Sequence, residues 1–352
     1  MKKYSPILYL IFLLVSCKET DEKNVIHVDL NDTLPCINYS SFVESVEYRD
    51  LHITDSLPVG SVERLYLDKD KIFVQDGGNE GILVFDRLSG NLLKRINCFG
   101  EGPKEIKRIS AFCLDTYHSL VCIFDDGDMK IKMYDYSGNY VSSYPTKDFF
   151  IDMVKLDEHT MTYFYPIYAN GEQNEGVWTS DTLGHFKKRM TSCVTEECKF
   201  HYFPMMYNYN GSSAYYYDRN WDELSVVTPD SLQKLYTFDL QQSIPMHKRG
   251  NRSITPYDLD GDAILHVFAC SEHFLLLAFH SFDKADIRKK NITWLLMNME
   301  TGEKMISNHL KNDLTTKDES TDNSLFYVNN RTWIRTDNSS EDLLRLQVLH
   351  LK

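Results

Sequence analysis

Two stretches in the first half of the chain repeat one pattern of hydrophobic and polar positions. Residues 62–92 and 109–140 each contain an apolar strand ending in Leu-Asp, a turn, a second apolar strand ending in Asp, a polar loop, and a third strand before Ser-Gly-Asn. Gly90 and Gly138, at the same place in the two copies, lie 48 residues apart. Short apolar runs broken by Asp, Gly and Asn are typical of strands joined by hairpin turns. The pattern therefore predicts a repeated unit of antiparallel strands.

Weaker copies of this unit continue toward the C-terminus. They share an apolar strand and a polar turn, at Met153–Asp157, Ser180–Gly184, Glu223–Val227 with Thr228–Ser231, and Trp294–Asn298 with Glu300–Gly302. The interval widens before the last copy, which predicts an inserted loop over 241–262 or 281–291. From Gly60 to Lys352 there are 293 residues, and 293/48 is close to six units.

Repeats of this length, each a small antiparallel sheet, predict an all-β fold. Sheets of four strands stacked radially around an axis form a β-propeller, which leaves only short sheet edges exposed. We therefore predict a six-bladed β-propeller of four-stranded antiparallel blades over residues 25–352. A solenoid is the alternative, although helix-pair signatures are absent. Val25–Leu30 alternates like a strand, and we expect it to complete the last blade and close the ring.

The N-terminus reads as a targeting segment. Lys2 and Lys3 precede an apolar run over Ile7–Val15, which is too short to span a bilayer and suits a secretory signal peptide. Leu14-Val15-Ser16-Cys17 resembles a bacterial lipobox. The resemblance implies a signal peptide over residues 1–16, lipidation of Cys17, and a flexible tether over 17–24. A simple signal peptide with an incidental Cys is the alternative.

Two segments carry a family resemblance. Ser41–Leu51 (SFVESVEYRDL) and Phe99–Ile106 (FGEGPKEI) are similar to the opening segment and the inter-blade motif of a six-bladed β-propeller family common in Bacteroidetes lipoproteins, itself similar to NHL-type propellers. Lys104 stands where that motif usually has Gly. Acidic residues soon after Cys17 also resemble the surface-export signal of such lipoproteins. The resemblance implies an outer-membrane lipoprotein exposed at the cell surface, and it assigns no catalytic residues.

Composition narrows the class of protein. The 352 residues include 38 Lys and Arg against 51 Asp and Glu, a net charge of −13. A charge this acidic argues against a nucleic-acid partner, because phosphate neutralisation needs clustered Lys and Arg. Hydrophobic residues at 42% and charged residues at 25% are typical of a globular domain.

The cysteines suggest few cross-links. Lipidation of Cys17 leaves seven, an odd number, so a full disulfide framework is excluded. Cys193 and Cys198 are close enough in sequence to form a disulfide, which the sequence leaves open. Cysteines in apolar strand runs are expected to be buried; these are Cys113, Cys122 and Cys270. No second Cys or His pair stands at zinc-ligand spacing, so we predict no metal and no cofactor.

Two acidic runs offer calcium-like chemistry. Asp258–Asp262 (DLDGD) resembles the start of a calcium loop, but Ala269 occupies the twelfth position, where an EF-hand needs Glu. An Asp-Gly hairpin turn is the favoured interpretation. Asp125–Asp128 (DDGD) is expected to form a solvated turn between two strands.

Aromatic residues gather over 200–221. Tyr202, Tyr207, Tyr209 and Trp221 are the candidate ligand-binding residues, because exposed rings on propeller loops could stack on sugars. The alternative is that these rings fill blade cores. No P-loop, Gly-x-Ser-x-Gly or His-Glu-x-x-His motif is present, and no catalytic residue is predicted.

The resulting functional prediction is a non-enzymatic, lipid-anchored propeller that binds a glycan, a peptide or an envelope protein. A metal-dependent lyase or hydrolase with its site in the central channel is the alternative, because one fold hosts many activities. Three or more His or carboxylate side chains converging on the axis would favour the enzyme. An accessory subunit of an envelope complex is a third possibility.

Overall fold

The structure is a computed structural model. It describes residues 24–53, 59, 61–77, 81–96, 100–165, 176–191, 205–209, 212–249, 251, 253–286, 289, 291–315, 325–337 and 343–352. Within these ranges no helix is long and apolar enough to cross a lipid bilayer.

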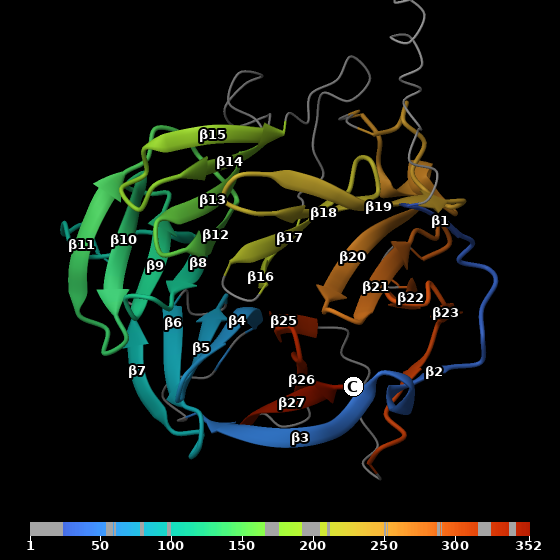
Figure 1. Cartoon of the computed structure of the whole chain (residues 1–352), viewed down its shortest axis with the longest axis horizontal. Helices are drawn as coiled ribbons and strands as arrows, with labels where there is room; N and C mark the ends of the chain where they lie inside the picture. Colours follow the sequence, from blue (N-terminus) through green and yellow to red (C-terminus); the bar gives the residue numbers. More distant parts are fainter. Residues whose placement is uncertain are drawn as a thin grey trace, which may run out of the picture.

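Six antiparallel blades surround a central axis (Figure 1), so the predicted all-β, six-bladed propeller is confirmed. Each blade is a sheet of four consecutive strands, except that the sixth takes its outermost strand from the N-terminal region. Blade 1 contains β4 (Val62–Asp68), β5 (Lys71–Asp76), β6 (Gly81–Asp86) and β7 (Leu92–Ile96). Blade 2 contains β8 (Ile109–Asp115), β9 (Leu120–Asp125), β10 (Lys130–Asp135) and β11 (Tyr140–Pro145). Blade 3 contains β12 (Asp152–Asp157), β13 (Thr160–Tyr165), β14 (Gly176–Ser180) and β15 (Phe186–Thr191). Blade 4 contains β16 (Met205–Tyr209), β17 (Ser213–Asp218), β18 (Glu223–Val227) and β19 (Leu232–Leu240). Blade 5 contains β20 (Ala263–Cys270), β21 (Phe274–Ser281), β22 (Asn291–Asn298) and β23 (Lys304–Ser307). Blade 6 contains β25 (Leu325–Asn329), β26 (Thr332–Asp337), β27 (Leu343–Leu351) and β3 (Val43–His52).

Ring closure differs from the prediction. The last blade is completed by β3, which pairs antiparallel with β27 from Val43 opposite Leu351 to His52 opposite Leu343. Val25–Leu30, the segment that we expected to close the ring, instead contains β1 (Val25–Val28). This strand pairs parallel with β19 and is a fifth strand of blade 4. The alternating pattern identified a strand correctly, but it could not choose between two distant sheet edges.

Residues 25–52 form a belt around the outer edges of three consecutive blades (Figure 1). After β1, the backbone amide of Leu34 donates to Ile306 O at 2.7 Å. Next, β2 (Ile37–Asn38) pairs parallel with β24 (Leu310–Lys311), beyond the outer strand of blade 5. The short 3-10 helix η2 (Tyr39–Ser41) leads into β3. The belt therefore covers the outer edges of blades 4, 5 and 6.

The hydrophobic core consists of six clusters, one at each interface between neighbouring blades. In β5, for example, Ile72 and Val74 pack toward blade 6, whereas Phe73 packs toward blade 2. Alternate residues of a strand point to opposite faces, and here both faces are covered. The middle strands therefore read as continuous apolar runs. Burial of Cys113, Cys122 and Cys270 in these strands is confirmed.

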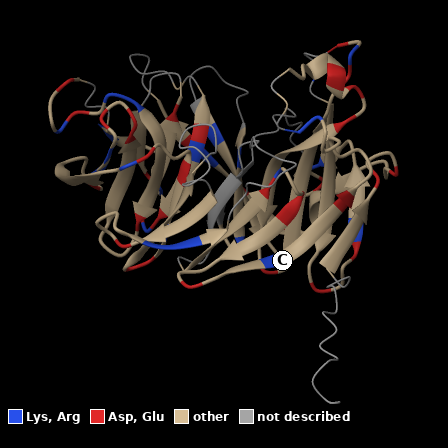
Figure 2. Ribbon diagram, turned by 90° about the horizontal axis from the view of Figure 1, so that it is seen from above, with Lys and Arg blue, Asp and Glu red and all other residues tan. Residues whose placement is uncertain are grey.

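The two faces of the ring carry different connections. Short turns join the first strand to the second and the third to the fourth, for example at residues 69–70 and 158–159. At one such turn, Gly90 has a φ of +70° and approaches Asp50 O so closely that a Cβ would lie 2.0 Å away. Longer connections, including residues 100–108, 146–151 and 241–262, lie on the other face, which we call the long-loop face (upper edge in Figure 2).

The Asp125–Asp128 turn differs from the solvated turn that we expected. The turn is present, but the side chains of Asp125 and Lys132 are both 0% exposed, and Lys132 Nζ lies 2.6 Å from Asp125 Oδ2. Lys132 also donates to Asp128 at 2.8 Å and to the carbonyl oxygen of Glu105. The hydrogen bonds that Asp128 accepts from Lys132 and Lys107 lower the pKa of its carboxyl group to about 2. The turn thus holds the preceding inter-blade loop against blade 2.

Candidate functional site: an amide-lined cavity on the long-loop face

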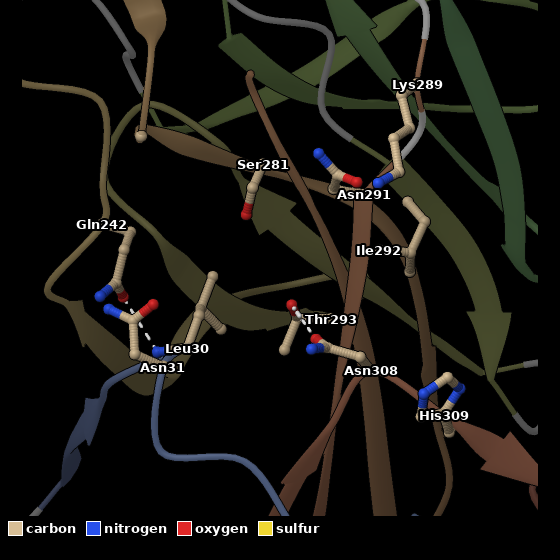
Figure 3. A pocket seen from close by; sticks show the side chains of 11 residues that line it. Leu30, Asn31, Gln242, Ser281, Lys289, Asn291, Ile292, Thr293, Asn308 and His309 are labelled. Carbon is tan, nitrogen blue, oxygen red and sulfur yellow. Dashed lines mark hydrogen bonds between the residues drawn. The ribbon is translucent and has the colours of Figure 1, made fainter. Parts of the chain in front are cut away.

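A cavity of about 530 Å³ opens at the edge of blade 5 on the long-loop face (Figure 3). Its volume lies within the range of small-molecule sites. Three separate parts of the chain build it. The belt contributes Leu30 and Asn31, the connection between blades 4 and 5 contributes Gln242, and blade 5 contributes residues from the ends of β21, β22 and β23.

The lining consists mainly of carboxamides and hydroxyls. These polar side chains are Asn31, Gln242, Asn291, Asn308, Ser281 and Thr293, and Lys289 and His309 complete the polar lining. A carboxamide both donates and accepts hydrogen bonds, and so does a hydroxyl. The described lining contains no carboxylate. Such a surface complements a ligand rich in hydroxyl groups.

Some of these groups are fixed by the protein, and others remain free. Gln242 accepts a hydrogen bond from Leu30 N at 2.9 Å and donates to Asp29 at 2.8 Å. Thr293 Oγ1 donates to Asn308 Oδ1 at 2.8 Å. By contrast, the Asn291 carboxamide and the Ser281 hydroxyl make no hydrogen bond with the described residues. Figure 3 shows both at the same side of the cavity.

A buried ion pair holds the connection that supplies Gln242. Arg249 Nη2 lies 2.9 Å from Asp222 Oδ2, and both side chains are almost fully buried. Ser243 Oγ donates to the same carboxylate oxygen at 2.5 Å, and Arg249 Nε donates to Ile244 O at 2.5 Å. The cavity wall is therefore fixed before any ligand binds, which lowers the entropic cost of binding.

The acidic run Asp258–Asp262 lies in this same connection and is not a hairpin turn. Asp258 accepts hydrogen bonds from Thr255 at the start of η3 (Pro256–Leu259). Asp260 pairs with Lys284 at 2.9 Å, and Asp262 pairs with Lys248 at 2.8 Å. The three carboxylates thus have three different partners instead of converging on one point. The predicted inserted loop over 241–262 is confirmed.

The family profile described as "Domain of unknown function (DUF4934)" matches residues 23–344 of this chain. The chain belongs to the DUF4934 family. No curated protein matches the sequence.

Two crystal structures from Bacteroides resemble this DUF4934 propeller. A "Putative exported protein" of Bacteroides fragilis aligns over 93% of this chain and 99% of its own, with a TM-score of 0.72 and 14% identity. A member of the DUF4221 family from Bacteroides vulgatus aligns over 88% of this chain and 97% of its own, with a TM-score of 0.54 and 10% identity. At these identities the likeness concerns the fold alone.

None of the predicted site residues of this DUF4934 chain is among the described residues that line the cavity. Cys17 and Tyr202 lie outside the described residues, as do Cys193 and Cys198 of the suggested disulfide. Tyr207 and Tyr209 lie on β16, the first strand of blade 4, and their side chains are not among those described. Trp221 lines a separate, smaller cavity of about 200 Å³. A ligand-binding role for these residues stays a prediction.

Sequence reasoning missed the amide-lined cavity. Single Asn and Gln residues at strand ends also occur in ordinary turns, so Asn31, Gln242, Asn291 and Asn308 carry no distinctive local signal. Only the inserted loop over 241–262 pointed to this part of the DUF4934 propeller.

At the central axis, the Arg64 guanidinium pairs with Asp152 at 2.5 Å. This ion pair joins β4 of blade 1 to β12 of blade 3, past the first strand of blade 2. Within the described ranges, no three His, Cys, Asp or Glu side chains form a group that could hold a metal ion.

Asp218→Asn is expected to stabilise the DUF4934 propeller at pH 8 by about 1–3 kcal/mol and to have little effect near pH 4. Asp218 lines the Trp221 cavity, and burial raises the pKa of its carboxyl group from 3.8 to about 6. The Asp218 carboxyl group therefore holds its proton more tightly in the folded protein than in the unfolded chain. For this reason the free energy of unfolding falls as the pH rises from about 4 to 6. Urea unfolding at both pH values measures the change.

The same substitution at the exposed Asp230 of blade 4 controls for the loss of one negative charge. Equal effects of Asp218→Asn at pH 8 and pH 4 would contradict the prediction.

Proposed function

We propose that this protein is a cell-envelope binding module that holds a saccharide in the amide-lined cavity. The observation that carries the proposal is the lining itself, in which carboxamides and hydroxyls surround about 530 Å³ without a carboxylate. Saccharide hydroxyls pair well with groups that both donate and accept. Leu30 and Ile292 add apolar surface for the C–H faces of a sugar ring.

The direction of the chain supports a display role. β1 runs parallel to β19, from the short-turn side toward the long-loop face. A lipid tether at Cys17 would therefore attach from the short-turn side and leave the cavity directed away from the membrane. The name of the Bacteroides fragilis relative, an exported protein, agrees with a location outside the cytoplasm. Outer-membrane anchoring through Cys17 is part of this proposal.

A thermal-shift series on the purified full-length protein tests the ligand class. The probes are cellohexaose, xylohexaose, maltohexaose and mannohexaose. A ligand that binds only the folded state stabilises it by about 2.7 kcal/mol at 100 times its dissociation constant. We expect at least one of the four to raise Tm, and Asn291→Ala to weaken its binding by about three- to tenfold, the equivalent of one neutral hydrogen bond.

Asn91→Ala is the matched control, because Asn91 is an exposed asparagine at a turn on the opposite face. It should bind the oligosaccharide like the wild type. If none of the four oligosaccharides raises Tm, or if Asn291→Ala binds as tightly as Asn91→Ala, the saccharide proposal is wrong. A peptide or protein ligand would then take its place.

A further inference from the structure

A second cavity, of about 650 Å³, lies between blades 2 and 3. Its lining includes Tyr144 at the end of β11, Tyr163 and Tyr165 on β13, and the more exposed Leu183 and Phe186 at its mouth. The polar side chains of Thr146, Lys147 and His185 also line it. The three tyrosines are buried, whereas Leu183 is 61% exposed and Phe186 is 38% exposed. We call this cavity the aromatic crevice. It shares no lining residue with the amide-lined cavity.

The rings of the aromatic crevice are arranged as a partly open cage. The ring of Tyr165 lies 5.6 Å from that of Phe186, edge to face, and 6.2 Å from that of Tyr163. On the opposite side, Gly184 rests on the ring of Tyr144. A Cβ at Gly184, where φ is +82°, would lie 2.7 Å from that ring. The aromatic surfaces are therefore held in place, with space left between them, and they favour a flat apolar ligand.

Two hydroxyl groups that line the aromatic crevice make no hydrogen bond with the described residues. The hydroxyls of Tyr144 and Tyr163 lie 3.2 Å apart, and Ser180 donates to Tyr163. In contrast, the hydroxyl of Tyr165 makes no hydrogen bond with the described residues, and its oxygen keeps contact with solvent although the residue as a whole is only 3% exposed. Thr146 Oγ1, in the same lining, is buried and has no partner among the described residues. A buried hydroxyl such as that of Thr146 is costly unless something else satisfies it. Burial also raises the pKa of Tyr165, so the Tyr165 hydroxyl stays protonated and can donate.

We propose that the aromatic crevice binds a small planar aromatic molecule that carries a hydroxyl or carbonyl group. The ring of the ligand lies among Tyr144, Tyr165 and Phe186, and its oxygen atom pairs with the Tyr165 hydroxyl. This site is independent of the proposed saccharide site, because the two cavities lie on different blades.

The test compares 2-naphthol with naphthalene, which has the same rings but no oxygen. Binding of each to the purified full-length protein is measured by the fluorescence of the ligand. We expect 2-naphthol to bind about tenfold more tightly than naphthalene, because only 2-naphthol can pair with Tyr165. Tyr165→Phe should remove this difference and leave naphthalene binding unchanged. Because the Tyr165 hydroxyl has no protein partner, this variant should also keep the wild-type Tm.

Two further variants locate the bound ligand. Phe186→Ala removes the ring at the mouth of the aromatic crevice and should weaken both ligands by about tenfold. Tyr257→Ala removes an exposed ring from η3, at a distant part of the surface, and should change neither affinity. The proposal is overturned if Phe186→Ala binds both ligands like Tyr257→Ala. It is also overturned if Tyr165→Phe still prefers 2-naphthol to naphthalene.

Discussion

Asp125→Ala is expected to lower the free energy of unfolding by about 4–5 kcal/mol. The carboxylate accepts hydrogen bonds from the backbone amides of Lys107, Arg108 and Gly127 at 2.9–3.1 Å, as well as from Lys132. Alanine would leave the Lys132 ammonium buried with only part of its partners, and three amides would lose their acceptor. Urea unfolding monitored by circular dichroism measures the loss.

Asp70→Ala provides the control for Asp125→Ala. Asp70 occupies an exposed turn of blade 1, where its carboxylate pairs with Lys71 at 3.1 Å, and its removal should leave stability nearly unchanged. A second control combines Asp125→Ala with Lys132→Met, so that both buried charges are removed. This double variant should be more stable than Asp125→Ala alone, because no unpaired charge stays buried. The explanation fails if Asp125→Ala unfolds at the same urea concentration as Asp70→Ala.

Arg249→Met is expected to destabilise the protein by about 3–5 kcal/mol and to abolish binding in the amide-lined cavity. The substitution leaves the carboxylate of Asp222 buried, with only the hydroxyls of Ser243 and Tyr217 as side-chain partners. It also removes the bond to Ile244 O that fixes the connection bearing Gln242. Unfolding in urea gives the stability, and titration with the tightest of the four oligosaccharides gives the affinity.

Lys248→Met controls for this prediction, because Lys248 is the preceding residue and its ion pair with Asp262 is partly exposed. It should cost about 1 kcal/mol or less and keep the cavity functional. If the two variants lose equal stability, the Asp222–Arg249 pair does not have the structural role assigned to it. If Arg249→Met still binds the oligosaccharide normally, the connection does not depend on this pair for its position.

The fold could be predicted where the signals are local. Blades 1 and 2 each repeat strand, turn and glycine at nearly constant spacing, and hairpin pairing links neighbours in sequence. The partner of β1 was beyond such reasoning, because Val25 pairs with Thr237 more than 200 residues away. A period of two identifies a strand and its buried face, but it carries no information about which sheet edge the strand joins.

The sites depended even more on distant contacts. The Asp-Asp-Gly-Asp run was predicted as a turn, yet burial of Asp125 follows from Lys132 on the next strand and from the amides of the loop before blade 2. The amide-lined cavity joins segments around residues 30, 242, 291 and 308, none of which is unusual alone. The predicted aromatic ligand-binding residues lie within 200–221, whereas the tyrosines that line the aromatic crevice lie on β11 and β13.

The belt has a consequence for the order of folding. It precedes the strands of blades 1 to 5 in the chain, yet its partners β19, β24 and β27 all follow Ser231. Blades 1 to 3 pair through neighbouring strands, whereas the belt needs contacts of very high sequence separation, which form slowly. The ten-residue β3 therefore remains an unpaired edge until β27 has been synthesised. The ring closes only when β27 pairs with β3, so a chain in which β27 is not yet present is the form most exposed to aggregation.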